Sequence, residues 1–150
     1  MSSLREQILS AALTALNTSH PSGVPATVRG RHRNLTPDQL PALSLYPGPE
    51  DTVQPVHHSR SPIMQRSLGI VIEAVAAASS GMTADQAVDP LCAWAVKALA
   101  GNLFGALATA ALEVKTRFRY GVAGKTPVCL ARVEFQIAYS SHVNDLERAG

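Results

Sequence analysis

Few groups in this sequence have the type and spacing that catalysis requires. Gly124-Lys125-Thr126 matches only the end of a phosphate-binding loop, because position 119 holds an arginine where that motif requires glycine. A strand is expected to follow, so the helix amino terminus that would bind phosphate is missing. The tripeptide therefore predicts a hairpin turn, within residues 121–127, and no nucleotide cofactor.

A metal site is conceivable around the adjacent pair His57 and His58, since Glu50 and Asp51 lie just upstream. Adjacent side chains in an extended segment point apart, however, and no cysteine or i, i+4 partner completes a ligand set. We predict no metal here and interpret the segment as a solvated loop or an interface loop.

The remaining groups also give no catalytic pattern. The sequence has no G-x-S-x-G motif, and Glu73 and Glu134 are the only carboxylates expected to share a sheet. They are interpreted as solvent-face charges that pair with Arg66 or Arg132 across strands. The sequence thus predicts a protein without enzymatic activity, catalytic residues or cofactors.

Basic residues form the sharpest charge feature. Three arginines alternate in a predicted strand over residues 27–33, and Lys115, Arg117 and Arg119 form a second alternating row. Such rows suit a solvated edge strand protected by charge, or a dock for an acidic partner surface or for passing DNA. The candidate docking residues are Arg29, Arg31, Arg33, His57, His58, Arg60, Lys115, Arg117, Arg119 and Lys125.

Composition indicates one globular unit. The chain has 150 residues, 46% hydrophobic and 16% charged, which suffices for one core, so we predict a single domain over residues 1–150. A net charge of +2 does not indicate nucleic-acid or membrane binding. No apolar run is long enough to span a membrane and no signal peptide is visible, so we expect a soluble, non-exported protein. Cys92 and Cys129 are expected to be buried free thiols.

The elements that must position these residues follow from hydrophobic periodicity. A helix over residues 4–16 begins at the capping box of Ser3 and Glu6, and a second helix over 91–99 follows Asp89-Pro90. The composition of residues 47–62 predicts a long loop, and that of residues 141–150 predicts a flexible tail. Strands are expected at residues 27–33, 42–46, 66–78, 112–120 and 128–139, of which the last alternates most regularly.

This order of elements resembles the tail terminator proteins of long-tailed bacteriophages, the minor tail protein U type. The resemblance spans nearly the whole chain and lies mostly in element order and apolar spacing. The stretches that carry it are LPALSLYPGPED (residues 40–51), RSLGIVIEAVAAA (66–78) and DPLCAWAVKAL (89–99). It implies an α+β fold of order α-β-β-β-α-β-β, with an antiparallel four- to five-stranded sheet and helices packed on one face.

The resemblance also implies a structural virion protein that caps the tail tube as a homohexameric ring, ends tube polymerisation and provides the surface for head–tail joining. Implied partners are further copies of the chain, the major tail tube protein and the head–tail connector, with possible passing contact to DNA in the lumen and none to membranes. Implied locations are the head-proximal end of the tail and, during assembly, the host cytoplasm. We expect the strand over 66–78, the loop before it and the hairpin at 120–125 to contribute ring contacts, because they carry more exposed hydrogen-bonding backbone than one domain needs.

Two alternatives remain open at this point. A neck or head–tail completion protein would share the same small α+β plan. A ligand-binding α+β domain or small-molecule enzyme would require a pocket with convergent polar groups.

Overall fold

The computed structural model describes residues 2–32, 34–56 and 62–150. Over these residues the chain forms two α-helices, one short 3-10 helix and six strands, so the predicted α+β class is confirmed. Their bounds are α1 Leu4–Thr18, β1 Val28–Arg29, η1 Pro37–Gln39, β2 Ala42–Val56, β3 Ile63–Ala77, α2 Ala84–Leu99, β4 Ala110–Ala123, β5 Thr126–His142 and β6 Asp145–Ala149.

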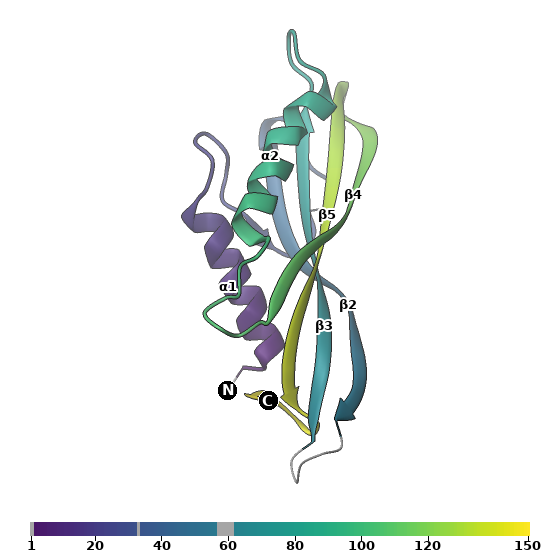
Figure 1. Ribbon diagram of the computed structural model, residues 1–150. Helices are drawn as coiled ribbons and strands as arrows, with labels where there is room; N and C mark the ends of the chain where they lie inside the picture. Colours follow the sequence, from purple (N-terminus) through teal and green to yellow (C-terminus); the bar gives the residue numbers. More distant parts are fainter. Residues whose placement is uncertain (1, 33, 57–61) are drawn as a thin grey trace.

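All six strands belong to one sheet of order β1-β2-β3-β5-β4, and β6 pairs with the end of β5. The neighbouring pairs β2 with β3, β3 with β5 and β5 with β4 are antiparallel, but β1 runs parallel to β2. The sheet is therefore mixed and six-stranded, and the expected purely antiparallel sheet of four to five strands is wrong in these two respects. The long strands twist strongly along their length (Figure 1).

Both helices lie on the same side of this sheet (Figure 1). Alternate β5 side chains from Cys129 to Tyr139 are fully buried there, as the period-two pattern predicted. They pack with the apolar faces of α1 and α2, including Ile8, Leu16 and Val88. Among the described residues, neither helix is long and apolar enough to cross a membrane.

The helix starts are set by local side chains. Ser3 caps α1 as predicted, because its hydroxyl accepts a hydrogen bond from the Glu6 amide. The second helix begins at Ala84, seven residues before its predicted start, because Thr83 and Gln86 form a capping box. Pro90 consequently lies inside α2, where its exposed ring is tolerated, and the predicted cap at Asp89 is wrong.

Two segments predicted to lack regular structure are strands. Residues 47–56 of the expected loop continue β2, although they contain three prolines. Beyond Leu45, β2 has β3 as its only strand neighbour among the described residues, and an edge strand tolerates missing amide donors. The expected tail includes the end of β5 and all of β6, which pair with each other.

The long strand β3 pairs with β2 on one side and β5 on the other, so its backbone is not free for ring contacts. The expectation that it carries exposed hydrogen-bonding backbone is wrong. The residues just before it, 57–61, lie outside the described part of the chain.

Candidate functional site

The helices leave the opposite face of the sheet uncovered, and we call it the open face. On β5 it carries Leu130, Arg132, Glu134 and Gln136, each half-buried, in alternation with the buried core residues. Side chains directly opposite one another on neighbouring strands point to the same side. The register therefore assigns further residues to this face: Ser44, Tyr46, Glu73, Lys115, Arg117 and Arg119.

At the centre of the open face lies Glu73, a carboxylate only 4% exposed. Its Oε2 accepts a 2.7 Å hydrogen bond from the hydroxyl of Tyr46 and lies 3.5 Å from Arg31 Nε and 3.7 Å from Arg132 Nη2. Burial, this hydrogen bond and the carboxylate charge raise the pKa of Tyr46 to about 12. Pairing of Glu73 with Arg132 was predicted, whereas its expected exposure to solvent was wrong.

A row of cations runs beside this centre along β4. Arg117 lies opposite Arg132 and Arg119 opposite Leu130, so both arginines stand on the open face together with Lys115. Arg31 joins them, because it lines the same hollow of about 180 Å³ as Arg117, Arg119 and Arg132. Among the described residues, the carboxylates that the register places directly opposite members of this group are Glu73 and Glu134, although the whole chain is nearly balanced at +2.

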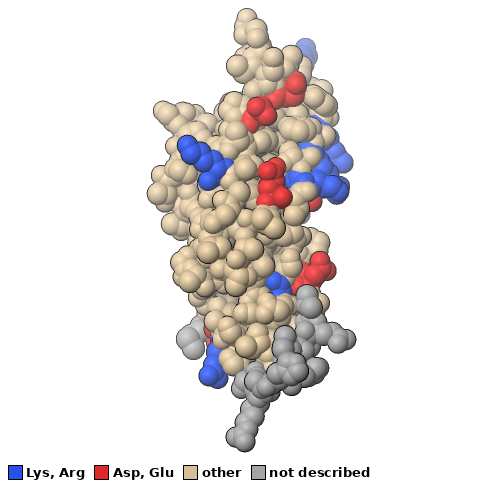
Figure 2. Space-filling view, in the orientation of Figure 1, with Lys and Arg blue, Asp and Glu red and all other residues tan. Residues whose placement is uncertain are grey.

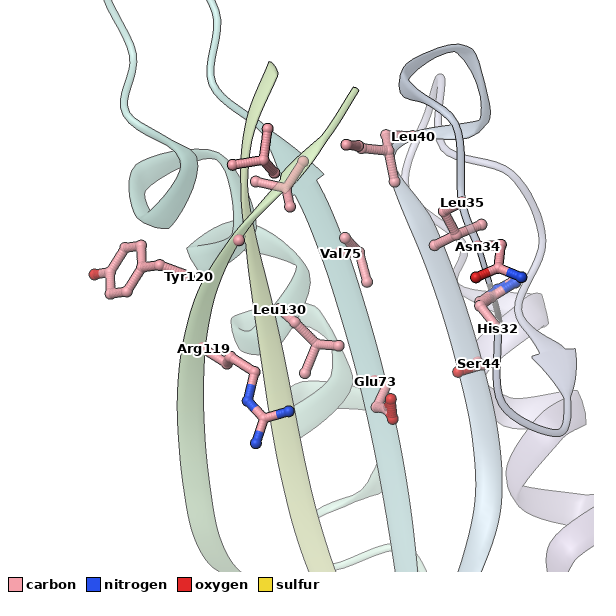
Figure 3. Close-up of a pocket in the computed structure, with 14 residues that line it drawn as sticks. His32, Asn34, Leu35, Leu40, Ser44, Glu73, Val75, Arg119, Tyr120 and Leu130 are labelled. Atoms are coloured by element: carbon pink, nitrogen blue, oxygen red, sulfur yellow. The ribbon is translucent and has the colours of Figure 1, made fainter. Parts of the chain in front are cut away.

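Next to the hollow, a trough of about 310 Å³ lies between the segment before β2 and the β4–β5 hairpin. Arg119 and Leu130 line both the hollow and the trough, so the two adjoin. Figure 3 shows Arg119, Leu130 and Glu73 on this side of the sheet, with Tyr120 pointing away from it. The upper trough is apolar, with Leu35, Leu40, Val75 and Leu130 among its lining residues.

The helix side of β4 has the opposite character. Asp85 and Asp89 of α2 line a groove together with Phe118 and Tyr120 of β4, and we call it the acidic groove. Figure 2 shows Lys and Arg gathered at the margin where β4 runs, beside Asp and Glu on the helix side. One strand therefore separates a basic surface from an acidic, aromatic one.

β4 is also an unpaired edge of the sheet. Among the described strands only β5 pairs with it. Near its start the Ala111 carbonyl accepts a hydrogen bond from the Gly101 amide, and beyond that residue no described strand covers the outer edge of this 14-residue strand. A long apolar edge of this kind favours association with another chain. Its large exposed apolar side chains are Leu112, Val114, Phe118, Tyr120 and Val122.

The structure brings together only part of the predicted docking set. Arg31 meets the β4 row, but Arg29 instead forms an ion pair with Glu6, since Gly30, with φ of +92°, ends β1 between the two arginines. Lys125 is exposed in the β4–β5 turn, away from the hollow. The other candidates lie outside the described residues: Arg33, His57, His58 and Arg60.

Sequence reasoning did not predict the acidic groove or the burial of the Glu73 side chain. The only sequence signal for the groove is the i, i+4 spacing of Asp85 and Asp89, which becomes meaningful once both are known to lie in one helix. Assignment of Arg132 to the basic surface requires the register between β4 and β5.

Groups with catalytic potential are placed where their reactivity is low. Both cysteines are buried and unpaired, as predicted. Burial, followed by the nearby charge of Asp89, raises the pKa of Cys92 to about 11, and burial also raises the pKa of Cys129. Gly124 and Lys125 form the predicted hairpin turn. Across the described ranges, no three His, Cys, Asp or Glu side chains gather in a way that could hold a metal ion.

Comparison with known proteins adds no relative: no protein-family model matches the sequence, and no curated protein matches it significantly.

Proposed function

We propose that this protein is a structural component of a phage tail, a terminator that forms a homohexameric ring on the tail tube and ends its polymerisation. The observation that carries the proposal is the long edge strand β4, which pairs only with β5 among the described strands and carries five large exposed apolar side chains. An edge of this kind promotes aggregation of a monomer, whereas in an assembly it can form a contact with a neighbouring chain.

The charges on β4 favour contact between two different surfaces. If two β4 strands paired antiparallel around the basic row, Arg117 would lie opposite Arg117 of the second copy, with Lys115 opposite Arg119. Like charges placed directly across strands are destabilising. Contacts between unlike surfaces repeat around an axis, and they give closed rings when the rotation closes.

In this proposal the ring binds the major tail tube protein on one rim and the head–tail connector on the other. The element order supports the assignment in part, because α1, β1, β2, β3, α2, β4 and β5 follow the implied order, while η1 and β6 are additional elements. The open-face cations would lie beside neighbouring copies or beside DNA passing through the lumen.

The proposal is tested by polymerisation of purified tail tube protein with and without this protein. Electron microscopy should show tubes that stop growing and carry one ring at an end when it is present. The variant Val122→Lys, altered at an exposed edge position, should cap fewer tubes at equal concentration. Unchanged tube growth would contradict the proposal. Binding to the connector protein alone would instead favour a neck completion protein.

A further inference from the structure

The acidic groove carries two charges that have no ion-pair partner in the part of the chain that the structure describes. Asp85 and Asp89 are one turn apart on α2, and among the described residues neither has an ion-pair partner. Beside them, Phe118 and Tyr120 are 48% and 68% exposed. A surface that combines two carboxylates with two exposed aromatic rings is suited to a basic surface that also offers an apolar recess.

The open face has a complementary excess of positive charge. Arg117 and Arg119 have no ion-pair partner in the described part of the chain, and Glu73 is already shared by Tyr46, Arg31 and Arg132. The buried Nε of Arg132 also lacks a hydrogen-bond partner. Guanidinium groups bind carboxylates in a bidentate manner, so two further carboxylates would satisfy this cluster.

The apolar trough beside the arginines makes the open face complementary to the aromatic residues of the acidic groove as well as to its charges. Its volume of about 310 Å³ and its Leu40, Val75 and Leu130 lining suit an aromatic side chain next to the arginine hollow. An aromatic ring that enters such a recess is a common anchor of an interface.

We propose that the acidic groove of one copy docks on the open-face arginines of the next copy, with Asp85 and Asp89 against Arg117 and Arg119. The two patches lie on opposite faces of one sheet, so they cannot meet within a single chain. The contact joins unlike surfaces and therefore repeats head to tail. The inference rests on the proposed function only in requiring that copies of this chain assemble.

Reciprocal charge reversal tests this contact. The basic-face variant combines Arg117→Glu with Arg119→Glu, and the acidic-groove variant combines Asp85→Lys with Asp89→Lys. Sedimentation velocity should show each variant, folded by circular dichroism, self-associating at least about tenfold more weakly than wild type. An equimolar mixture should recover assembly, because every contact in an alternating ring then joins opposite charges. The control variant, Lys97→Glu with Arg148→Glu, alters two exposed cations elsewhere and should assemble normally.

The inference is overturned if both folded variants assemble as wild type does, or if their mixture stays dissociated. It is also overturned if the basic-face variant loses only affinity for a short DNA duplex, since the arginines would then serve DNA. If the charge-reversed variants, each tested alone, still capped tubes, the interface would be refuted and the terminator proposal would stand. If the mixture recovered assembly but capped no tubes, the interface would stand and the terminator proposal would be refuted. A wild type that stays monomeric even with tail tube protein overturns both.

Discussion

At the scale of single residues, the fold contains a second charge centre, which is half-buried on the helix side at the end opposite the β4–β5 turn. Glu50 of β2 accepts hydrogen bonds from Arg5 of α1 and Tyr139 of β5, and Arg66 lies 3.5 Å away. Because the partners come from α1, β3 and β5, the centre ties the first helix to the sheet. Burial alone would raise the pKa of Glu50, but the hydrogen bonds from Arg5 and Tyr139 outweigh it and hold the pKa below its ordinary value of 4.5.

This depressed pKa predicts an acid-dependent loss of stability. The carboxylate is ionised in both the folded and the unfolded chain above pH 4.5, so its stabilising contribution is complete there and declines as the pH falls through the folded-state pKa. Urea unfolding should therefore show Glu50→Gln to be less stable than wild type at pH 7, with the difference narrowing below pH 4.5. The exposed neighbour Asp51→Asn is the control. A difference that stays constant from pH 7 to pH 3 would refute this prediction.

At the scale of elements, the path of β2 through its prolines depends on one glycine of β3. The register between these strands shifts between Pro47 and Glu50, and the chain there approaches Gly69 closely. A Cβ at Gly69 would lie 2.7 Å from the Pro49 carbonyl oxygen, which is backbone and cannot rotate away. The irregular edge strand therefore requires glycine on the strand beside it.

We expect Gly69→Ala to lower the free energy of unfolding by about 1–3 kcal/mol, because the β2 backbone must shift to admit the methyl group. Gly121→Ala in β4 is the matched control, since the nearest atom to its Cβ is a side-chain carbon at 3.8 Å. Chemical denaturation of both variants at neutral pH measures the effect. Equal stabilities for the two variants would show that β2 adapts without cost.

At the scale of the whole molecule, charge is segregated across the sheet margin formed by β4. The basic open face and the acidic groove lie on its two sides, and the exposed apolar residues run along it. Within the described ranges, Arg117 and Arg119 on one surface and Asp85 and Asp89 on the other have no ion-pair partner, so the molecule has two unlike surfaces that can bind other chains. Its association should therefore depend on the β4 margin more than on any other exposed apolar position.

Leu112, 63% exposed on β4, provides the test. Leu112→Lys should leave the free energy of unfolding within about 0.5 kcal/mol of wild type, as exposed substitutions usually do. It should weaken self-association in sedimentation equilibrium, because a charge replaces apolar surface at the edge. Met82→Lys, at an apolar residue that is 48% exposed in the turn before α2, should leave association unchanged. Equal effects from both substitutions would argue against a specific margin.

The sequence by itself determined the features that depend on near neighbours. The period-two pattern of β5, the cap at Ser3 and the turn at Gly124 and Lys125 were all predictable, because each depends on residues within a few positions. The α+β class was readable for the same reason, whereas the expected order of elements lacked the 3-10 helix and β6. The basic rows were also visible, although the pattern did not indicate which of their residues would meet.

Only the tertiary structure decided the long-range pairings. Tyr46 and Arg132, 86 positions apart, converge on Glu73 because β2 and β5 both flank β3. Pairing with β3 also keeps β2 extended despite its prolines, and the strand order leaves β4 at the edge of the sheet. Strand pairing brings together side chains that are distant in the chain, so no local pattern could show which carboxylate is buried or which cations lack partners.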